Sequence, residues 1–143
     1  MFGAPSDSGI LILGESGAGK SSVTLKLLAS GAKLVADDRV ELFVRDGILH
    51  ARAPAPLAGL IEARGLGIVA LPFASDSRIA LAVQLGPVPP RYPDRDDYEP
   101  PAPLIVRAGT PLLRLSAGDM AIAEKIVLAA AAFSNALFRE VPQ

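Results

Sequence analysis

The sequence contains no cysteine, no tryptophan and a single histidine among its 143 residues. The absence of cysteine excludes disulfides and thiolate metal sites, and it is typical of proteins in a reducing compartment. The formal net charge is −1, and no basic stripe favours a nucleic-acid partner. No apolar run approaches the roughly 18 residues of a membrane span, and the first eight residues lack the pattern of a signal peptide. We therefore expect a cytoplasmic protein without membrane contact.

Apolar residues make up half of the chain, enough for one domain with an adequate core across residues 1–143. Their periodicity predicts an α/β fold. Strands are expected at 9–14, 33–36, 40–44, 48–51, 66–71, 79–85, 104–106 and 112–115. A first helix is expected at 20–30, ended by Gly31, and a final one at about 117–138, capped within residues 116–119 and burying Ile122, Ile126, Phe133 and Leu137. Asp46-Gly47 predicts a tight hairpin turn.

Residues 87–103 differ in composition from the rest of the chain. They hold seven of the thirteen prolines and the acidic residues Asp94, Asp96, Asp97 and Glu99. Proline at this density excludes a helix or a central strand. We expect either a long functional loop or a partly disordered segment.

A phosphate-binding motif, G-x-x-x-x-G-K-[ST], directly follows the first expected strand and is matched at every fixed position. Its glycines let backbone N–H groups point at phosphate oxygens, and the next helix adds its positive dipole end. Lys20 supplies a mobile charge for the β- and γ-phosphates, and Ser21 a hydroxyl for Mg²⁺. A plain glycine-rich turn would not explain Lys-Ser at the helix start. The expected nucleotide-binding residues are Gly14, Glu15, Ser16, Gly17, Ala18, Gly19, Lys20, Ser21 and Ser22.

Two adjacent carboxylates, Asp37 and Asp38, follow the second expected strand. Open α/β sheets place their ligand crevice at the carboxyl ends of strands, where the phosphate-binding loop also lies. Because neighbouring carboxylates repel, one can hold a raised pKa and act as a base. The other can stay ionised and face a metal or Lys20. The alternative is an aspartate pair that only starts a turn or a hairpin.

Glu62 and Arg64 are charged residues within an apolar stretch. Buried charges are usually paired or bind metal, and in an extended chain these two point to the same side. From the residues alone, a structural ion pair is an equal alternative. Residues 65–70 also fit a dinucleotide-binding pattern, but residues 68–72 read as a strand where that pattern needs a helix.

The remaining candidates for functional residues have less support from the sequence. His50 falls on an expected hairpin strand, where a surface or packing role is favoured over catalysis. Four arginines, Arg91, Arg95, Arg107 and Arg114, could reach a phosphate, but most of them are expected to be surface charges.

Three blocks together resemble the catalytic domain of HPr kinase/phosphorylase, which phosphorylates a serine of the phosphocarrier protein HPr. They are GESGAGKSS at residues 14–22, GAKLVADDRVEL at 31–42 and APLAGLIEARGLGI at 55–68. The resemblance covers residues 9–71, and the chain looks like the short form of the family found in alphaproteobacteria. It implies a P-loop-containing, phosphoenolpyruvate-carboxykinase-like mixed sheet flanked by helices.

The resemblance also implies an activity, the ATP-dependent phosphorylation of a serine in an HPr-like carrier. ATP and Mg²⁺ are the implied cofactors, and a homo-oligomer, a hexamer in the family, is the implied assembly. Asp38 would accept the serine proton, with Asp37 beside it. Carried over to this sequence, the catalytic residues are Lys20, Asp37, Asp38 and Arg64, and the magnesium ligands are Ser21 and Glu62.

The sequence departs from the family pattern at several points. The family's catalytic histidine precedes the P-loop, and no histidine lies between Met1 and Lys20. Ser22 stands where an acidic residue is usual, and residues 106–109 are only a partial counterpart of a family loop near the C-terminal helix. These departures put the phosphorylase reaction in doubt and leave the kinase reaction as the expected activity. A non-catalytic ATP-sensing module of the phosphotransfer system is the alternative function.

Overall fold

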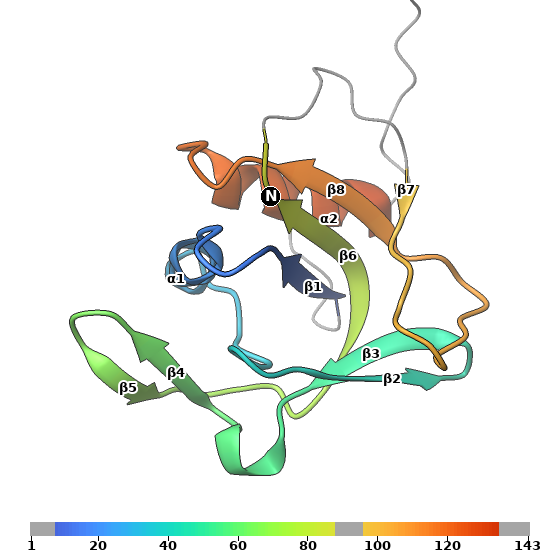
Figure 1. Ribbon diagram of the computed structural model, residues 1–143, viewed down its shortest axis with the longest axis horizontal. Coiled ribbons are helices and arrows are strands. Elements are labelled where there is room, and N and C mark those ends of the chain that lie inside the picture. The colour runs from blue at the N-terminus through green and yellow to red at the C-terminus, as the bar shows by residue number, and fades with distance from the viewer. Residues whose placement is uncertain (1–7, 88–95, 135–143) are drawn as a thin grey trace, which may run out of the picture.

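The computed structural model describes residues 8–87 and 96–134 (Figure 1). The strands are β1 (Ser8–Leu13), β2 (Glu41–Arg45), β3 (Ile48–Arg52), β4 (Leu60–Ala63), β5 (Gly67–Ala70), β6 (Ser77–Leu85), β7 (Asp96–Asp97) and β8 (Pro111–Leu115). The helices are α1 (Lys20–Ala29) and α2 (Ile122–Ser134), and Ala55–Leu57 form a short 3₁₀ helix. The fold is therefore a mixed α/β fold, as expected.

A six-stranded sheet forms the centre of the molecule. Its long strand β6 pairs in parallel with both β1 and β8, while β3 joins the start of β6 in antiparallel fashion. Because β1, β6 and β8 run in the same direction, their carboxyl ends meet at one edge of the sheet. The loop that follows β1 starts at this edge. Strands β4 and β5 form a separate two-stranded sheet.

Two apolar clusters form the core, one on each face of the central sheet. The first joins α1 and α2 to β6, with Val23, Leu81 and Ile126 fully buried in it. The second joins β1 and β6 to the β2–β3 hairpin around Leu11 and Leu49. Successive residues of a strand point to opposite faces, so one apolar strand can serve both clusters.

The hairpin between β2 and β3 confirms the expected Asp46-Gly47 turn. Asp46 has φ 54° and Gly47 has φ 76°, two consecutive left-handed residues. This is the conformation of a two-residue turn whose twist matches that of the flanking strands.

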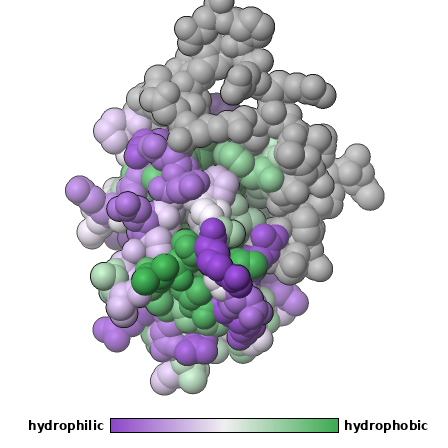
Figure 2. Space-filling view, turned by 90° about the vertical axis from the view of Figure 1, so that its right-hand side faces the viewer, coloured by the Kyte–Doolittle hydropathy of each residue, from purple (hydrophilic) through white to green (hydrophobic). Residues whose placement is uncertain are grey.

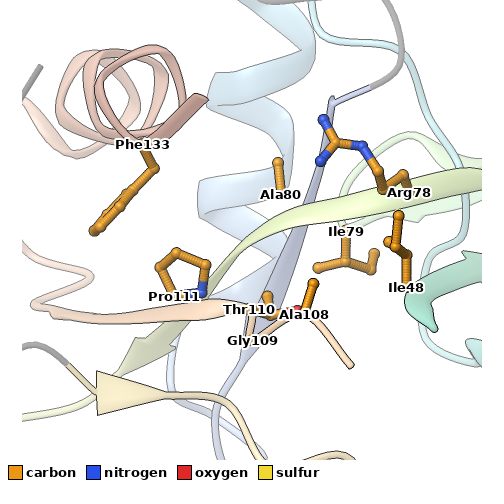
Figure 3. A pocket seen from close by; sticks show the side chains of 9 residues that line it. All are labelled: Ile48, Arg78, Ile79, Ala80, Ala108, Gly109, Thr110, Pro111 and Phe133. Atoms are coloured by element: carbon orange, nitrogen blue, oxygen red, sulfur yellow. The ribbon is translucent and has the colours of Figure 1, made fainter. Parts of the chain in front are cut away.

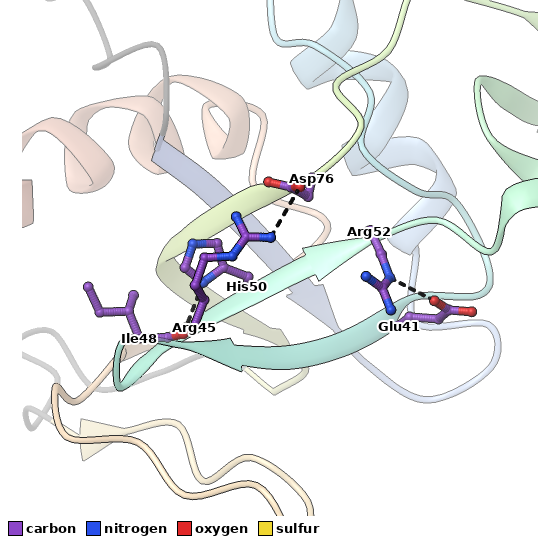
Figure 4. A network of polar contacts seen from close by, with 6 residues as sticks. All are labelled: Glu41, Arg45, Ile48, His50, Arg52 and Asp76. Atoms are coloured by element: carbon purple, nitrogen blue, oxygen red, sulfur yellow. Dashed lines mark hydrogen bonds and ion pairs between the residues drawn. The ribbon is translucent and has the colours of Figure 1, made fainter.

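His50 lies on this hairpin, in a packed position. Its ring stacks on Phe43 of the opposite strand with centroids 5.4 Å apart, and its Nδ1 lies 2.9 Å from the carbonyl oxygen of Ile48. Figure 4 shows two ion pairs around it, Arg52–Glu41 at 2.9 Å and Arg45–Asp76 at 3.7 Å. These contacts support a packing role for this histidine.

Two expected strands are wrong. Residues 33–36 form no strand, because Leu34 makes only an isolated bridge with Phe73 of another loop. Residues 104–106 form no strand either, since prolines stand at 100, 101 and 103 and the N–H of Leu104 closes a turn onto Pro101 at 3.1 Å. Strand β4 was not predicted from the sequence. It is only four residues long, too short for its alternation of buried and exposed residues to be recognised as a strand pattern.

The segment 87–103 contains neither a helix nor a central strand within its described part. Its residues Asp96 and Asp97 form the short strand β7, which pairs antiparallel with β8 at the edge of the sheet. An edge position tolerates nearby prolines, because one side of such a strand needs no ladder hydrogen bonds. Asp94 lies outside the described residues.

The last helix begins five residues later than expected. Residues 116–121 form turns, in which Asp119 Oδ1 accepts a hydrogen bond from the N–H of Ala121 at 2.8 Å. The helix then buries Ile122 and Ile126 completely and Phe133 in part, as expected. Leu137 and the expected end of the helix lie outside the described residues.

The surface is mixed in polarity. Figure 2, which views the right-hand side of Figure 1, shows apolar side chains gathered on this face with polar side chains between and around them. Within the described residues, no helix is both long and apolar enough to cross a membrane.

Replacing Leu81 by alanine is expected to lower the free energy of unfolding by about 2–5 kcal/mol, because it leaves a cavity between the sheet and the helices. Leu81 is fully buried, whereas Leu128 is 54% exposed. The matched substitution Leu128→Ala is therefore expected to change stability by less than about 0.5 kcal/mol. Urea unfolding followed by circular dichroism measures both, and equal effects would contradict the placement of the core.

Candidate functional site

The loop between β1 and α1 has the backbone shape of a phosphate-binding loop. Gly17 and Gly19 adopt left-handed φ values of 83° and 97°, and the N–H of Ala18 closes a turn onto the carbonyl of Glu15 at 2.9 Å. No side chain caps the start of α1, and its first turn contains no acidic residue. The first N–H groups of the helix are thus available to an anion, with the helix dipole favouring negative charge.

Lys20 and Ser21 lie at the start of α1, next to these N–H groups. Lys20 is half-buried, while Ser21 and Ser22 are exposed. No ion pair of the described residues involves Lys20. Its positive charge is therefore not neutralised by a carboxylate of the described chain.

Neighbouring segments pack closely on both ends of this loop. A Cβ added to Gly14 would lie 3.5 Å from the Cβ of Leu85 at the end of β6. A Cβ added to Gly19 would lie 2.8 Å from the Cβ of Ala117, closer than packing allows. The loop is thus held against the carboxyl ends of β6 and β8, and glycine at position 19 is required both by this contact and by its positive φ.

A hydrogen bond brings two predicted site segments together. The Oδ2 atom of half-buried Asp37 accepts a hydrogen bond from the backbone N–H of Glu62 at 3.2 Å. These residues lie 25 positions apart, so only the tertiary fold creates this link. Asp38 is exposed, and its carboxylate has no hydrogen bond or ion pair with another described residue.

Glu62 and Arg64 belong to the β4–β5 hairpin, which stands out from the central sheet in Figure 1. The expectation that these two charges are buried is wrong, because both are exposed. Ile61 and Ala63 are the buried residues of this strand. The strand alternates between core and solvent, so the apolar neighbours take the buried positions and leave the charges free for a ligand.

The segment that follows β8 contacts the phosphate-binding loop. Residues 106–109, the partial counterpart of a family loop, lie against the turn of the β2–β3 hairpin, where Arg107 Nη2 donates to the carbonyl of Asp46 at 3.2 Å. Residues 116–119 include Ala117, which contacts Gly19. In this segment, hydrogen bonds from Lys125 and the N–H of Ala121 lower the pKa of Asp119.

The cavity shown in Figure 3, with a volume of about 220 Å³, lies away from the phosphate-binding loop. It is formed at the amino ends of β6 and β8 together with the end of α2, by Arg78, Pro111 and Phe133 among others. The phosphate-binding loop follows the carboxyl end of β1, which runs parallel to β6. This cavity is therefore not part of the candidate site.

A second hollow, of about 420 Å³, lies directly beside the phosphate-binding loop. It is lined by Glu15, Ala18, Gln84, Leu85, Gly86, Pro87 and Arg114. Sequence reasoning missed Gln84 and named Arg114 only as one of four arginines that could reach a phosphate. The signal that could have found them is their place at the end of strands parallel to β1, the edge where open sheets bind ligands.

No group of three or more acidic or histidine side chains that could hold a metal occurs in the described part of the chain. Mg²⁺ commonly binds through one or two protein oxygens together with substrate phosphates. The exposed oxygens of Ser21 and Glu62 fit that kind of site.

Comparison with known sequences identifies the family. Residues 6–85, more than half of the chain, match the sequence model of the HPr serine kinase C-terminal domain. The chain belongs to this family. The HPr kinase/phosphorylase of Clostridium novyi is 47% identical over 64 residues, which cover 45% of this chain and 21% of that relative. The enzyme of the same name from Clostridium kluyveri is 51% identical over 61 residues, 43% of this chain and 20% of the relative.

The chain thus matches about a fifth of the length of these curated relatives. The HPr(Ser) kinase/phosphatase of Coxiella burnetii has a similar structure, with a TM-score of 0.73 over 93% of each chain. The two sequences are 21% identical, so this likeness bears on the fold. It agrees with the P-loop-containing mixed sheet expected from the sequence.

Proposed function

We propose that this protein is an ATP-dependent kinase that phosphorylates a serine of an HPr-like phosphocarrier protein. The observation that carries the proposal is the hydrogen bond from Glu62 to Asp37. It joins the aspartate pair to the charged β4–β5 hairpin, in a chain that also carries a phosphate-binding loop. The names of the Clostridium relatives support the same assignment.

In the proposed reaction the loop N–H groups and Lys20 hold the ATP phosphates. Mg²⁺, held by Ser21 and Glu62, would neutralise charge on the β- and γ-phosphates. The serine oxygen forms a bond to the γ-phosphorus while the bond to the bridging oxygen breaks, which releases ADP. Asp38 accepts the serine proton.

The contacts of the two aspartates support this division of roles. The carboxylate of Asp37 already accepts the Glu62 N–H, so it positions the hairpin. Asp38 is exposed and has no such partner in the described chain, and it is therefore the one available as a base. Arg64, exposed on the same hairpin as Glu62, carries a positive charge suited to the transferring phosphoryl group.

The test is to incubate the protein with MgATP and a purified HPr-like carrier and to measure the mass of the carrier. The expected result is the gain of one phosphoryl group on a serine, found by peptide mapping. ATP binding without any mass change would favour the non-catalytic ATP-sensing module instead. A mass gain that persists when the serine is replaced by alanine would contradict the proposed acceptor.

A further inference from the structure

The hollow beside the phosphate-binding loop is built from the loop itself and from the carboxyl ends of β6 and β8. Gln84 lies opposite Leu13 of β1 and opposite Arg114 of β8 in the two parallel ladders. The loop residues Glu15 and Ala18 form the adjoining wall. A ligand held by the loop therefore has this hollow at its side.

The charges of the hollow do not suit a phosphate group. The one cation among the described residues that line it, Arg114, is already paired with Asp96, with Nη1 and Oδ2 2.7 Å apart. Glu15 adds a negative charge on the loop side. Triphosphate is better served by Lys20 and the helix N-terminus, so the hollow fits the uncharged part of a ligand.

The remaining lining suits a flat heteroaromatic ring with hydroxyl groups. Ala18, Leu85 and Pro87 provide apolar walls. The amide of Gln84 makes only a long bond to the carbonyl of Leu85, at 3.4 Å, so its oxygen and a second N–H remain available. A side-chain amide can pair with both a donor and an acceptor on the edge of adenine, and a guanidinium plane can stack on a ring.

We propose that this hollow binds the nucleoside of ATP, with Gln84 as a specificity-determining residue. This inference rests on the proposed function, because it assumes that the loop holds a nucleoside triphosphate. The base lies against Ala18 and Leu85, Gln84 hydrogen-bonds its edge, and the carboxylate of Glu15 accepts a ribose hydroxyl. The volume of about 420 Å³ falls in the usual range for small-molecule sites, roughly 300–1,000 Å³.

Gly86 offers a direct way to block the hollow. It lines the hollow, its φ is not positive, and an added Cβ would meet no atom of the described residues within 4 Å. A leucine at this position is therefore expected to occupy part of the hollow. Gln84→Leu is a second variant that removes the amide and keeps a similar volume.

The test compares binding of MgATP with binding of magnesium and inorganic tripolyphosphate, which lacks the nucleoside, by titration calorimetry. Gly86→Leu and Gln84→Leu are each expected to weaken ATP binding by about tenfold or more, equivalent to about 1.4 kcal/mol. Their tripolyphosphate affinity is expected to stay within about twofold of wild type. Arg78→Gln, at the opposite end of β6, is the control and is expected to change neither affinity.

Two outcomes would overturn the inference in distinguishable ways. If ATP binding depends on Lys20 but neither hollow variant changes it, or if both variants weaken ATP and tripolyphosphate equally, the nucleoside lies elsewhere and the proposed kinase still stands. If the wild-type protein binds neither ligand, the proposed function fails together with this inference.

Discussion

Replacing Lys20 by glutamine is expected to reduce phosphoryl transfer by roughly 10²–10³-fold, the typical loss when one group that stabilises developing charge is removed. ATP affinity is also expected to fall, by about 1.5–3 kcal/mol if one hydrogen bond to a charged partner is lost. Lys20 is half-buried at the start of α1, beside helix N–H groups that no side chain caps. In the proposed function, its ammonium holds the β- and γ-phosphates.

The matched control is Lys26→Gln on the same helix. Lys26 is an exposed residue in the last turn of α1, so the change removes the same charge away from the loop. Its transfer rate and ATP affinity are expected to remain close to those of the wild type. Calorimetric titration with MgATP and a carrier phosphorylation assay measure the two effects, and equal losses in both variants would refute a specific role for Lys20.

Asp38→Asn is expected to slow phosphoryl transfer by about 10²–10⁴-fold, the usual contribution of a general base. The amide keeps the shape of the side chain but cannot accept the serine proton. Because Asp38 is exposed and has no hydrogen bond in the described chain, the substitution is expected to leave stability and ATP binding nearly unchanged. Single-turnover kinetics with saturating ATP isolate the transfer step from nucleotide binding.

Asp46→Asn provides the control for Asp38. Asp46 is an exposed carboxylate on the β2–β3 turn with φ 54°, a conformation that asparagine also tolerates. This variant is expected to transfer phosphate at the wild-type rate. Undiminished transfer by Asp38→Asn would show that another group, or water, takes the proton.

Local sequence patterns predicted several elements correctly because each depends on a few neighbouring residues. The β2–β3 turn needs two left-handed residues, which Asp46-Gly47 supply. The strand–loop–helix unit around Gly17 and Lys20 needs glycine at set positions, whatever surrounds it. The strands predicted at 33–36 and 104–106 failed because pairing needs a partner strand, and neither segment has one among the described residues.

Within the candidate site, the sequence identified the residue types but misjudged their surroundings. Glu62 was expected to be buried because its neighbours are apolar, yet the alternation of β4 turns it to solvent. The contact of Ala117 with Gly19 could not be predicted, because it depends on where the end of β8 meets the loop. The pairing of Gln84 with Arg114 likewise depends on strand register.

The sequence by itself determined the phosphate-binding loop, the aspartate pair and the charged pair at positions 62 and 64, because each is a short run of residues with its own chemistry. The tertiary structure decided how these runs relate. It placed the N–H of Glu62 on Asp37 and formed the hollow from the loop and the carboxyl ends of the parallel strands β6 and β8. Contacts between distant segments follow from packing and register of the whole sheet, which no local pattern contains.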